Sequence, residues 1–335
     1  MDLNILWFLL VTVLFIGFFF LEGFDYGVGM LVPIVAKSDL ERRVVINSIG
    51  PFWDGNEVWM ITAGGAMFAA FPHWYATLFS GFYLALFAIL LALIVRGVSF
   101  EFRSKVESVK WRKFWDGAIG VSSFLPALLW GVAVANLITG TPIGADMEYA
   151  GTFFTLLTPF TLLGGVVTFL LFLYHGAAFL LIKVGEDSIL ARLKGFALKA
   201  GVVLVVVTVA WVAYACFVTQ LLSKPVAIVA VLIAAVALLV SVYMQKLGRY
   251  GISFIASSAA VAFVTVTAFA IMFPDVMISS LDASYSLTIY TASSSPYTLK
   301  IMTIVAVCLV PVVLLYQIWN FWIFKKRITR DSVEY

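Results

Sequence analysis

Apolar residues occur along this chain in nine long runs, separated by short stretches that hold most of the charged residues. Each run is long enough to cross about 30 Å of hydrocarbon as a helix that rises about 1.5 Å per residue. The nine expected membrane spans are residues 3–36, 50–71, 76–98, 117–140, 153–182, 197–221, 225–246, 254–273 and 298–324. The pattern predicts an all-α, polytopic integral membrane protein. Since no connection is long enough for a soluble domain, we expect one membrane domain over residues 1–335.

Lysine and arginine are concentrated in alternate connections. All of the 21 basic residues except Lys224 and Lys300 lie in or beside the connections after the first, third, fifth and seventh spans, or in the C-terminal tail. Connections of this kind face the cytoplasm. We therefore expect an N-terminus outside the cell, a cytoplasmic C-terminus and an odd number of spans. No basic segment precedes the first run, so we expect it to be retained as a span.

Composition agrees with this class and argues against others. The chain is 63% hydrophobic and 12% charged, with a mean hydropathy of +1.07, whereas soluble domains are about half apolar. The connections account for the net charge of +3, so we expect membrane lipid and no nucleic acid as a partner. Cys216 and Cys308 each lie in an apolar run, which favours free thiols over a disulfide or a metal site.

Four acidic residues interrupt the first two spans: Glu22 and Asp25 in the first, Asp54 and Glu57 in the second. An aspartate at the centre of a span costs about 2.5–3.5 kcal/mol on insertion scales, and intramembrane acids therefore commonly serve function. The i, i+3 spacing of each pair places its members on one helix face. With the expected orientation all four lie in the cytoplasmic half, as candidate residues of a proton path.

These acids also have a structural interpretation. Near a helix end they could reach interfacial water, or pair with Arg96 or Arg43. Asp54 fits this interpretation less well, because it lies in the stretch WDGNEVW on an apolar helix. There Asn56 could hydrogen-bond a carboxylate, and a buried carboxyl group would exchange protons in a useful pH range.

Few residues could ligate haem or metal. The two histidines, His73 and His175, are expected near opposite faces of the membrane, which does not suit a haem held by both. For His175 we favour a helix–helix hydrogen bond over haem ligation. No phosphate-binding loop, dinucleotide fingerprint, nucleophile elbow or zinc spacing is present. We therefore assign no catalytic residue and no metal site to this chain.

Small residues and the longest basic connection have simpler interpretations. Gly23 and Gly27 have the GxxxG spacing of a helix contact. Gly64 and Gly65 are expected to allow a helix to approach closely. We expect the charged stretch 99–116 to be a solvated connector.

Six stretches of the chain strongly resemble subunit II of the bacterial cytochrome bd quinol oxidases. They are EGFDYGVGML (22–31), GPFWDGNEVWMITAGGAMFAAFP (50–72), RGVSFEFRSK (96–105), MFPDVMISS (272–280), SSPYTLKIM (294–302) and VPVVLLYQIW (310–319). They occur in order from one end to the other, so the resemblance covers the whole chain. The first two stretches are the most specific, and residues 120–250 match more loosely.

The resemblance implies a complex in the bacterial cell membrane. Subunit II pairs with a haem-bearing subunit I, often with a very small single-span subunit as well. The complex oxidises quinol and reduces O2 to water, and it takes protons from the cytoplasm, which builds a proton motive force without pumping. Subunit I holds the quinol site and haems of b and d type. The resemblance therefore implies a chain that ligates no cofactor itself.

The family also suggests roles for individual residues. Aspartates that match Asp54 and Asp25 are associated with a hydrophilic path from the cytoplasm toward the haems. Glu57 corresponds to a position where Gln also occurs, and Glu22 to one where Asp occurs. An apolar O2 route past Trp59 is implied by some members. Some members also hold a structural quinone in this subunit, and no residue here decides that point.

Two further hypotheses use the same acids. In the first, the chain is an ion-coupled transporter; the acids are off-centre and no internal repeat is visible, which argues against it. In the second, it is an assembly partner whose acids only pair with basic residues. Co-purification with a coloured, haem-bearing partner distinguishes an oxidase subunit from a transporter.

Overall fold

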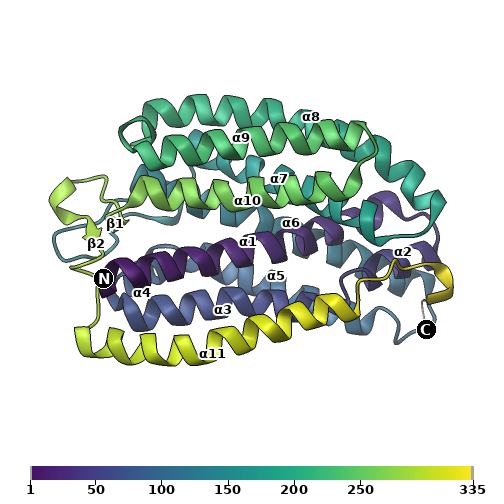
Figure 1. Cartoon of the computed structure of the whole chain (residues 1–335), viewed down its shortest axis with the longest axis horizontal. Helices are drawn as coiled ribbons and strands as arrows, with labels where there is room; N and C mark the ends of the chain where they lie inside the picture. Colours follow the sequence, from purple (N-terminus) through teal and green to yellow (C-terminus); the bar gives the residue numbers. More distant parts are fainter. Residues whose placement is uncertain (1, 333–335) are drawn as a thin grey trace.

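Nearly every apolar run forms a helix in the computed structural model, which describes residues 2–332 (Figure 1). The α-helices are α1 (Leu3–Val35), α2 (Asp39–Asn47), α3 (Trp53–Ala70), α4 (Pro72–Gly81), α5 (Tyr83–Phe102), α6 (Val109–Thr139), α7 (Pro159–Lys183), α8 (Asp187–Val218), α9 (Pro225–Lys246), α10 (Tyr250–Met272) and α11 (Pro296–Ile323). Short 3-10 turns are η1 (Phe153–Leu156), η2 (Leu221–Ser223), η3 (Ala283–Tyr285) and η4 (Arg330–Ser332), and the two strands are β1 (Asp275–Met277) and β2 (Leu287–Thr288).

Eight helices within the described residues are long and apolar enough to cross a membrane: α1 and α5 to α11. The all-α, multi-pass membrane fold is therefore confirmed. Helix α3 is not among the eight, and it carries Asp54 and Glu57. It nevertheless packs along α1 and leads from one end of the bundle toward the other (Figure 1). Nine crossings and the expected orientation remain predictions.

One expected span contains a break. Residues 76–98 belong to two helices, because α4 ends and α5 begins at Phe82. Phe82 has φ −99° and ψ 14°, which lies outside the α-helical region. Ser80 and Gly81 stand just before the break, and this pair is the local signal of it in the sequence. Elsewhere helices begin before the apolar run, as α6 does at Val109 with Ser108 as its N-cap.

A short surface helix, α2, occupies the connection after the first span. Ser38 caps it by accepting a hydrogen bond from the backbone N–H of Glu41, and the Glu41 side chain accepts from the Ser38 backbone N–H. This reciprocal arrangement is a capping box. It fixes the start of α2 and the position of Glu41 at one end of the bundle.

Helix α1 lies in the middle of the molecule, in contact with α3, α6, α7, α10 and α11 (Figure 1). Gly27 lies against Gly176 of α7, where an added Cβ would be 2.7 Å from the Gly176 Cα atom. The expected glycine contact is therefore confirmed for α1. A Cβ on Gly64 or Gly65 would meet nothing within 4 Å, so close approach at these two glycines is wrong within this chain.

The two ends of the bundle are closed differently. At the end that holds the N-terminus, β1 pairs with β2, and Thr141 forms a backbone bridge with Ser279 (Figure 1). At the opposite end the last described residues run back across the start of α8, and Ile328 forms a bridge with Val184. The described chain ends therefore lie at opposite ends of the bundle, as an odd number of crossings requires.

Ion pairs close the end that holds α2. Arg103 Nε lies 2.6 Å from Asp116 Oδ1, and Arg103 Nη2 lies 2.7 Å from Asp39 Oδ1. Arg103 and Asp116 are both buried. The expectation that residues 99–116 form a solvated connector is therefore wrong for this pair, because the connection folds back against α2.

Candidate functional site

A buried arginine joins two of the predicted acids. Arg96 of α5 donates from Nη1 to Glu22 Oε1 of α1, and from the same nitrogen to Glu57 Oε1 of α3 at 2.9 Å. Its guanidinium carbon lies 4.9 Å from the centre of the Tyr26 ring, within the range of a cation–π contact. Arg96, rather than Arg43, is therefore the cation that links the first three long segments of the chain.

The third acid of the cluster is held by an amide. Asn56 of α3 donates from Nδ2 to Asp25 Oδ2 at 2.6 Å. Gln317 of α11 in turn donates to Asn56 Oδ1 at 3.2 Å. Asn56 therefore bonds to Asp25 and not to its neighbour Asp54, and this chain of side chains connects α1, α3 and α11.

The cluster contains more acid than base. Glu22, Asp25 and Arg96 are fully buried, and the Glu57 side chain is 19% exposed. Three carboxyl groups thus face one guanidinium. Charge that is buried without a partner is expensive, so this excess favours protons bound on the cluster. Oδ1 of Asp25 and Oε2 of Glu22 accept no hydrogen bond from the described residues, which leaves them free to carry protons.

Asp54 lies apart from this cluster. It occupies the first turn of α3, its side chain is exposed, and Oδ1 accepts a hydrogen bond from the adjacent Gly55 N–H at 2.7 Å. The expectation that Asp54 is buried is therefore wrong within this chain. Glu57, three residues further along α3, accepts a hydrogen bond from Arg96, whereas the Asp54 side chain is exposed beside the cluster.

Trp59 lies two residues beyond Glu57 on α3 and packs against α1. An added Cβ on Gly17 would lie 2.2 Å from Trp59 Cε3, so the glycine is what lets the indole reach the helix. Trp59 also lines a cavity of about 540 Å³ bounded by α1, α7, α10 and α11. Trp59 therefore borders this mainly apolar space, and so does Gln317, which bonds to Asn56.

His175 is part of the packing between helices. Its Nδ1 lies 2.8 Å from Ser257 Oγ, its Nε2 lies 3.1 Å from the Phe20 carbonyl oxygen, and its ring stacks on Phe254. Both ring nitrogens have partners, which confirms the expected helix–helix hydrogen bond.

The second histidine, His73, lies exposed near the start of α4. The described residues contain no group of three or more His, Cys, Asp or Glu side chains that could hold a metal ion.

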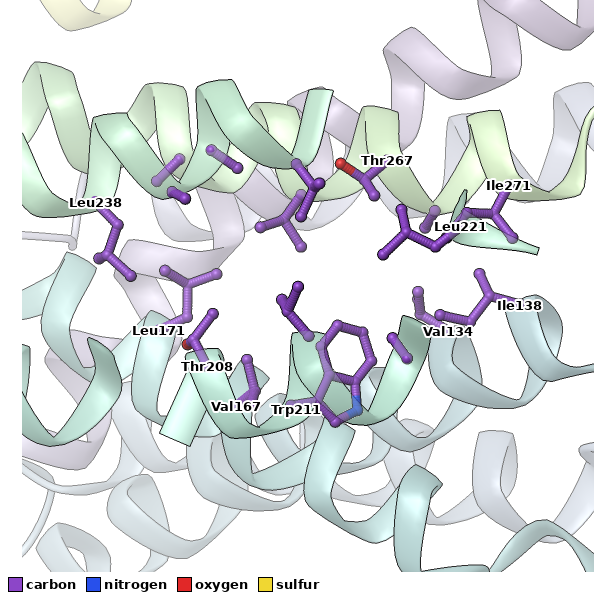
Figure 2. Close-up of a pocket in the computed structure, with 18 residues that line it drawn as sticks. Val134, Ile138, Val167, Leu171, Thr208, Trp211, Leu221, Leu238, Thr267 and Ile271 are labelled. Atoms are coloured by element: carbon purple, nitrogen blue, oxygen red, sulfur yellow. The ribbon is translucent and has the colours of Figure 1, made fainter. Parts of the chain in front are cut away.

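A second cavity lies between α6, α7, α8, α9 and α10, away from the acids (Figure 2). Its volume is about 80 Å³, and aliphatic side chains such as Leu171 and Leu238 form most of its wall. Trp211, Thr208 and Thr267 are its polar lining residues. It offers no titratable group, so it takes no part in proton chemistry.

Several residues of the site carry a weak signal in the sequence. Arg96 is foreseen only as a structural partner for acids, and Gln317 is not foreseen because one amide in a long apolar run resembles many others. Glu41, in α2 at the end of the bundle closed by ion pairs, is another residue that the sequence analysis did not single out. Burial raises its pKa, but hydrogen bonds from Arg192, the Lys37 backbone and Ser188 outweigh burial and lower the pKa to about 2. The capping-box pattern around Glu41 is the signal that could have located it.

Fold and site together define a multi-pass helical membrane protein with a buried acid–arginine cluster near one end. The family model described as cytochrome bd terminal oxidase subunit II matches residues 3–324. The chain therefore belongs to this family of bacterial membrane proteins.

Similar proteins agree over almost the full length. The cytochrome bd ubiquinol oxidase subunit 2 of Bacillus subtilis (strain 168) is 43% identical, covering 99% of this chain and 98% of the relative. The cytochrome bd-I ubiquinol oxidase subunit 2 of Escherichia coli (strain K12) is 40% identical, covering 99% and 97%. A chain of the bd oxidase from Geobacillus thermodenitrificans has a TM-score of 0.72 at 16% identity, covering 97% of this chain and all of that one, and it shows the fold alone.

Proposed function

We propose that this chain is the haem-free subunit of a quinol oxidase and carries protons toward the O2-reducing haems of its partner. The observation that carries the proposal is the cluster of three carboxyl groups around Arg96, buried where membrane-embedded acid is costly. A scaffold alone needs one carboxylate for one arginine. The excess of acid supports proton exchange.

The positions of the acids support a direction for this path. Asp54 is exposed and lies in the first turn of α3, close to the end of the bundle that holds most of the basic connections. Glu57 follows one turn further along, and Arg96 connects it to Glu22. Asp25 lies one turn from Glu22 on α1. Protons from the cytoplasm would meet Asp54 first and the buried carboxyl groups next.

The proposed partners follow from the family. Subunit I would hold the b and d haems and the quinol site, and a small single-span subunit would complete the complex. His175 supports this division because both of its ring nitrogens are occupied within the chain. The haem content of a complex with His175→Gln tests it. Unchanged b and d absorption bands are expected, while loss of one band would make His175 a ligand.

Part of the surface suits a partner subunit. In α11, Leu299 is the one buried residue, and the exposed Asp54 and the open Gly64 and Gly65 belong to the neighbouring α3. We propose that subunit I covers this surface. An O2 route along Trp59 belongs to the same proposal, and a changed KM for O2 in a Trp59→Ala complex tests that route.

The proton path is tested by O2 consumption of the purified complex, normalised to haem content. We expect Asp25→Asn to lower turnover about 10²-fold, the usual size of a lost proton-transfer group. Asp54→Asn should lower turnover less, because an exposed carboxylate collects protons that can also arrive through water. Asp146→Asn, in an exposed connection at the opposite end of the bundle, is the control and should leave turnover unchanged. Full turnover of Asp25→Asn at normal haem content would remove Asp25 from the path.

The ion pair of Arg96 favours a second candidate role. In that role Glu22 and Glu57 only neutralise Arg96 and hold α1, α3 and α5 together. Glu22→Gln would then destabilise the complex while leaving the turnover of each assembled complex unchanged. Turnover and melting temperature measured on the same preparation separate the two roles.

A further inference from the structure

Lys183, the last residue of α7, is buried and lacks an acidic partner among the described residues. It is 7% exposed, and its Nζ donates to the backbone carbonyl oxygen of Phe324 just after α11. No carboxylate of residues 2–332 forms an ion pair with it. The Phe324 carbonyl carries a partial charge only, so the ammonium charge is not neutralised.

The cavity of about 540 Å³ begins at this ammonium group. Lys183 and Lys325 both line it, and the remaining wall is mainly phenylalanine. The phenylalanines of the wall are Phe20, Phe24, Phe52, Phe179, Phe254, Phe321 and Phe324. Along α1 the lining extends from Phe24 to Gly17, which corresponds to about 10 Å of helix. The cavity is thus a mainly apolar groove with two cations at one end, and Gln317 is a further polar lining residue.

The cations lie at the end of the molecule where lipid headgroups are expected. Arg327 donates from Nε to the Ile182 carbonyl oxygen at 3.2 Å, which keeps a third cation beside Lys183. Glu186 and Glu41 at this end are already paired, with Arg330 and Arg192, and no acidic residue of the described chain lines the groove. The mouth of the groove therefore carries net positive charge.

We propose that this groove binds one anionic phospholipid, with its phosphate on Lys183 and Lys325 and an acyl chain along the phenylalanines. A phosphodiester supplies the missing negative charge and several acceptor oxygens in one group. A free phosphate would leave the apolar groove unfilled. A neutral quinone would fill the groove and leave the charge of both lysines uncompensated. Charge and wall together therefore select a lipid with an anionic headgroup, as basic pockets between membrane helices do.

The test counts lipids on the intact complex. The complex is purified in mild detergent as wild type and as Lys183→Gln/Lys325→Gln, and retained phospholipids and quinones are quantified by mass spectrometry. Glutamine keeps a donor for the Phe324 carbonyl and removes the charge. We expect the double variant to lose one anionic phospholipid per complex. Lys246→Gln is the control, because Lys246 is exposed at the same end on α9 and does not line the groove.

A second measurement uses Lys325→Gln alone, which changes an exposed side chain and leaves the packing of Lys183 intact. Adding phosphatidylglycerol should raise the melting temperature of the wild-type complex more than adding phosphatidylcholine does, and Lys325→Gln should reduce that difference. Equal anionic lipid counts in wild type and double variant would overturn the proposal. Loss of a quinone in place of a phospholipid would also overturn it.

Discussion

The side-chain amide of Asn56 in α3 donates a 2.6 Å hydrogen bond to the carboxyl group of Asp25 in α1. Both side chains are fully buried. The amide has its own partner, Gln317, so its orientation is fixed with the nitrogen toward Asp25. Asp25 is therefore held by a neutral donor, whereas Glu22 one turn away is held by an arginine.

Replacing Asn56 by leucine should affect both stability and turnover. It leaves a buried carboxyl group without a donor, at a cost of about 1–3 kcal/mol. We expect a lower melting temperature of the complex and turnover reduced about three- to tenfold, which corresponds to about 0.7–1.4 kcal/mol. Asn320→Leu is a matched control, since Asn320 donates from α11 to the Pro51 carbonyl oxygen and to no acid. An equal loss of turnover in both variants would show a packing effect.

Removing Arg96 should be among the most harmful single changes. Arg96→Leu leaves Glu22 and Glu57 without a cation, and breaking a buried ion pair in this way costs about 3–5 kcal/mol. We expect a low yield of complex and a lower melting temperature. Glu22→Gln and Glu57→Gln added to Arg96→Leu should restore part of the yield, because no charge is then left unpaired. A triple variant as unstable as Arg96→Leu alone would contradict this account.

Stability at low pH should depend on Glu41. Its pKa of about 2 lies below the ordinary value of 4.5, so its contribution is complete above pH 4.5 and is lost as the pH falls toward 2. The shift corresponds to about 3 kcal/mol at neutral pH. We expect Glu41→Gln to melt at a lower temperature at pH 7 and to change less than wild type between pH 4.5 and 2. Glu107→Gln, an exposed acid of the same end, should follow the wild type.

Assembly should depend on the open glycines of α3. Leucine at Gly64 meets no neighbour near its Cβ within this chain, so the fold should tolerate it. We expect Gly64→Leu to prevent co-purification with the haem-bearing subunit if that subunit packs on α3. Gly195→Leu on α8 introduces the same side chain at an equally open glycine on another face. Intact assembly of the Gly64→Leu complex would place the partner elsewhere.

Most of the fold could be predicted from hydropathy because bilayer thickness fixes helix length. The acid cluster could also be predicted, since Glu22, Asp25 and Glu57 interrupt apolar runs. The direction in which each of these side chains points could not be predicted. Asp54 and Glu57 share the spacing of one helix face, yet one is exposed and the other reaches Arg96.

Two other features are not visible in the hydropathy of the chain. Phe82 interrupts an expected span because hydropathy carries no information about backbone angles, and Ser80 and Gly81 are the only local signal of the break. Arg103 and Asp116 form a buried pair in a stretch whose composition is typical of exposed loops. Hydropathy reports neither the backbone angles at one residue nor which charged side chains are buried together.

The two closures of the bundle differ in their response to ionic strength. Backbone bridges and uncharged hydrogen bonds, such as Ser279 Oγ to the Ile143 carbonyl oxygen at 2.8 Å, hold the end with the N-terminus. The other end has the bridge between Val184 and Ile328 and the buried pair of Arg103 and Asp116, but it also depends on partly exposed ion pairs such as Arg330 with Glu186. Salt screens exposed pairs of this kind. Concentrated salt should therefore loosen one rim of the protein and leave the other unchanged, so hydrogen exchange at the two rims should separate as salt is added.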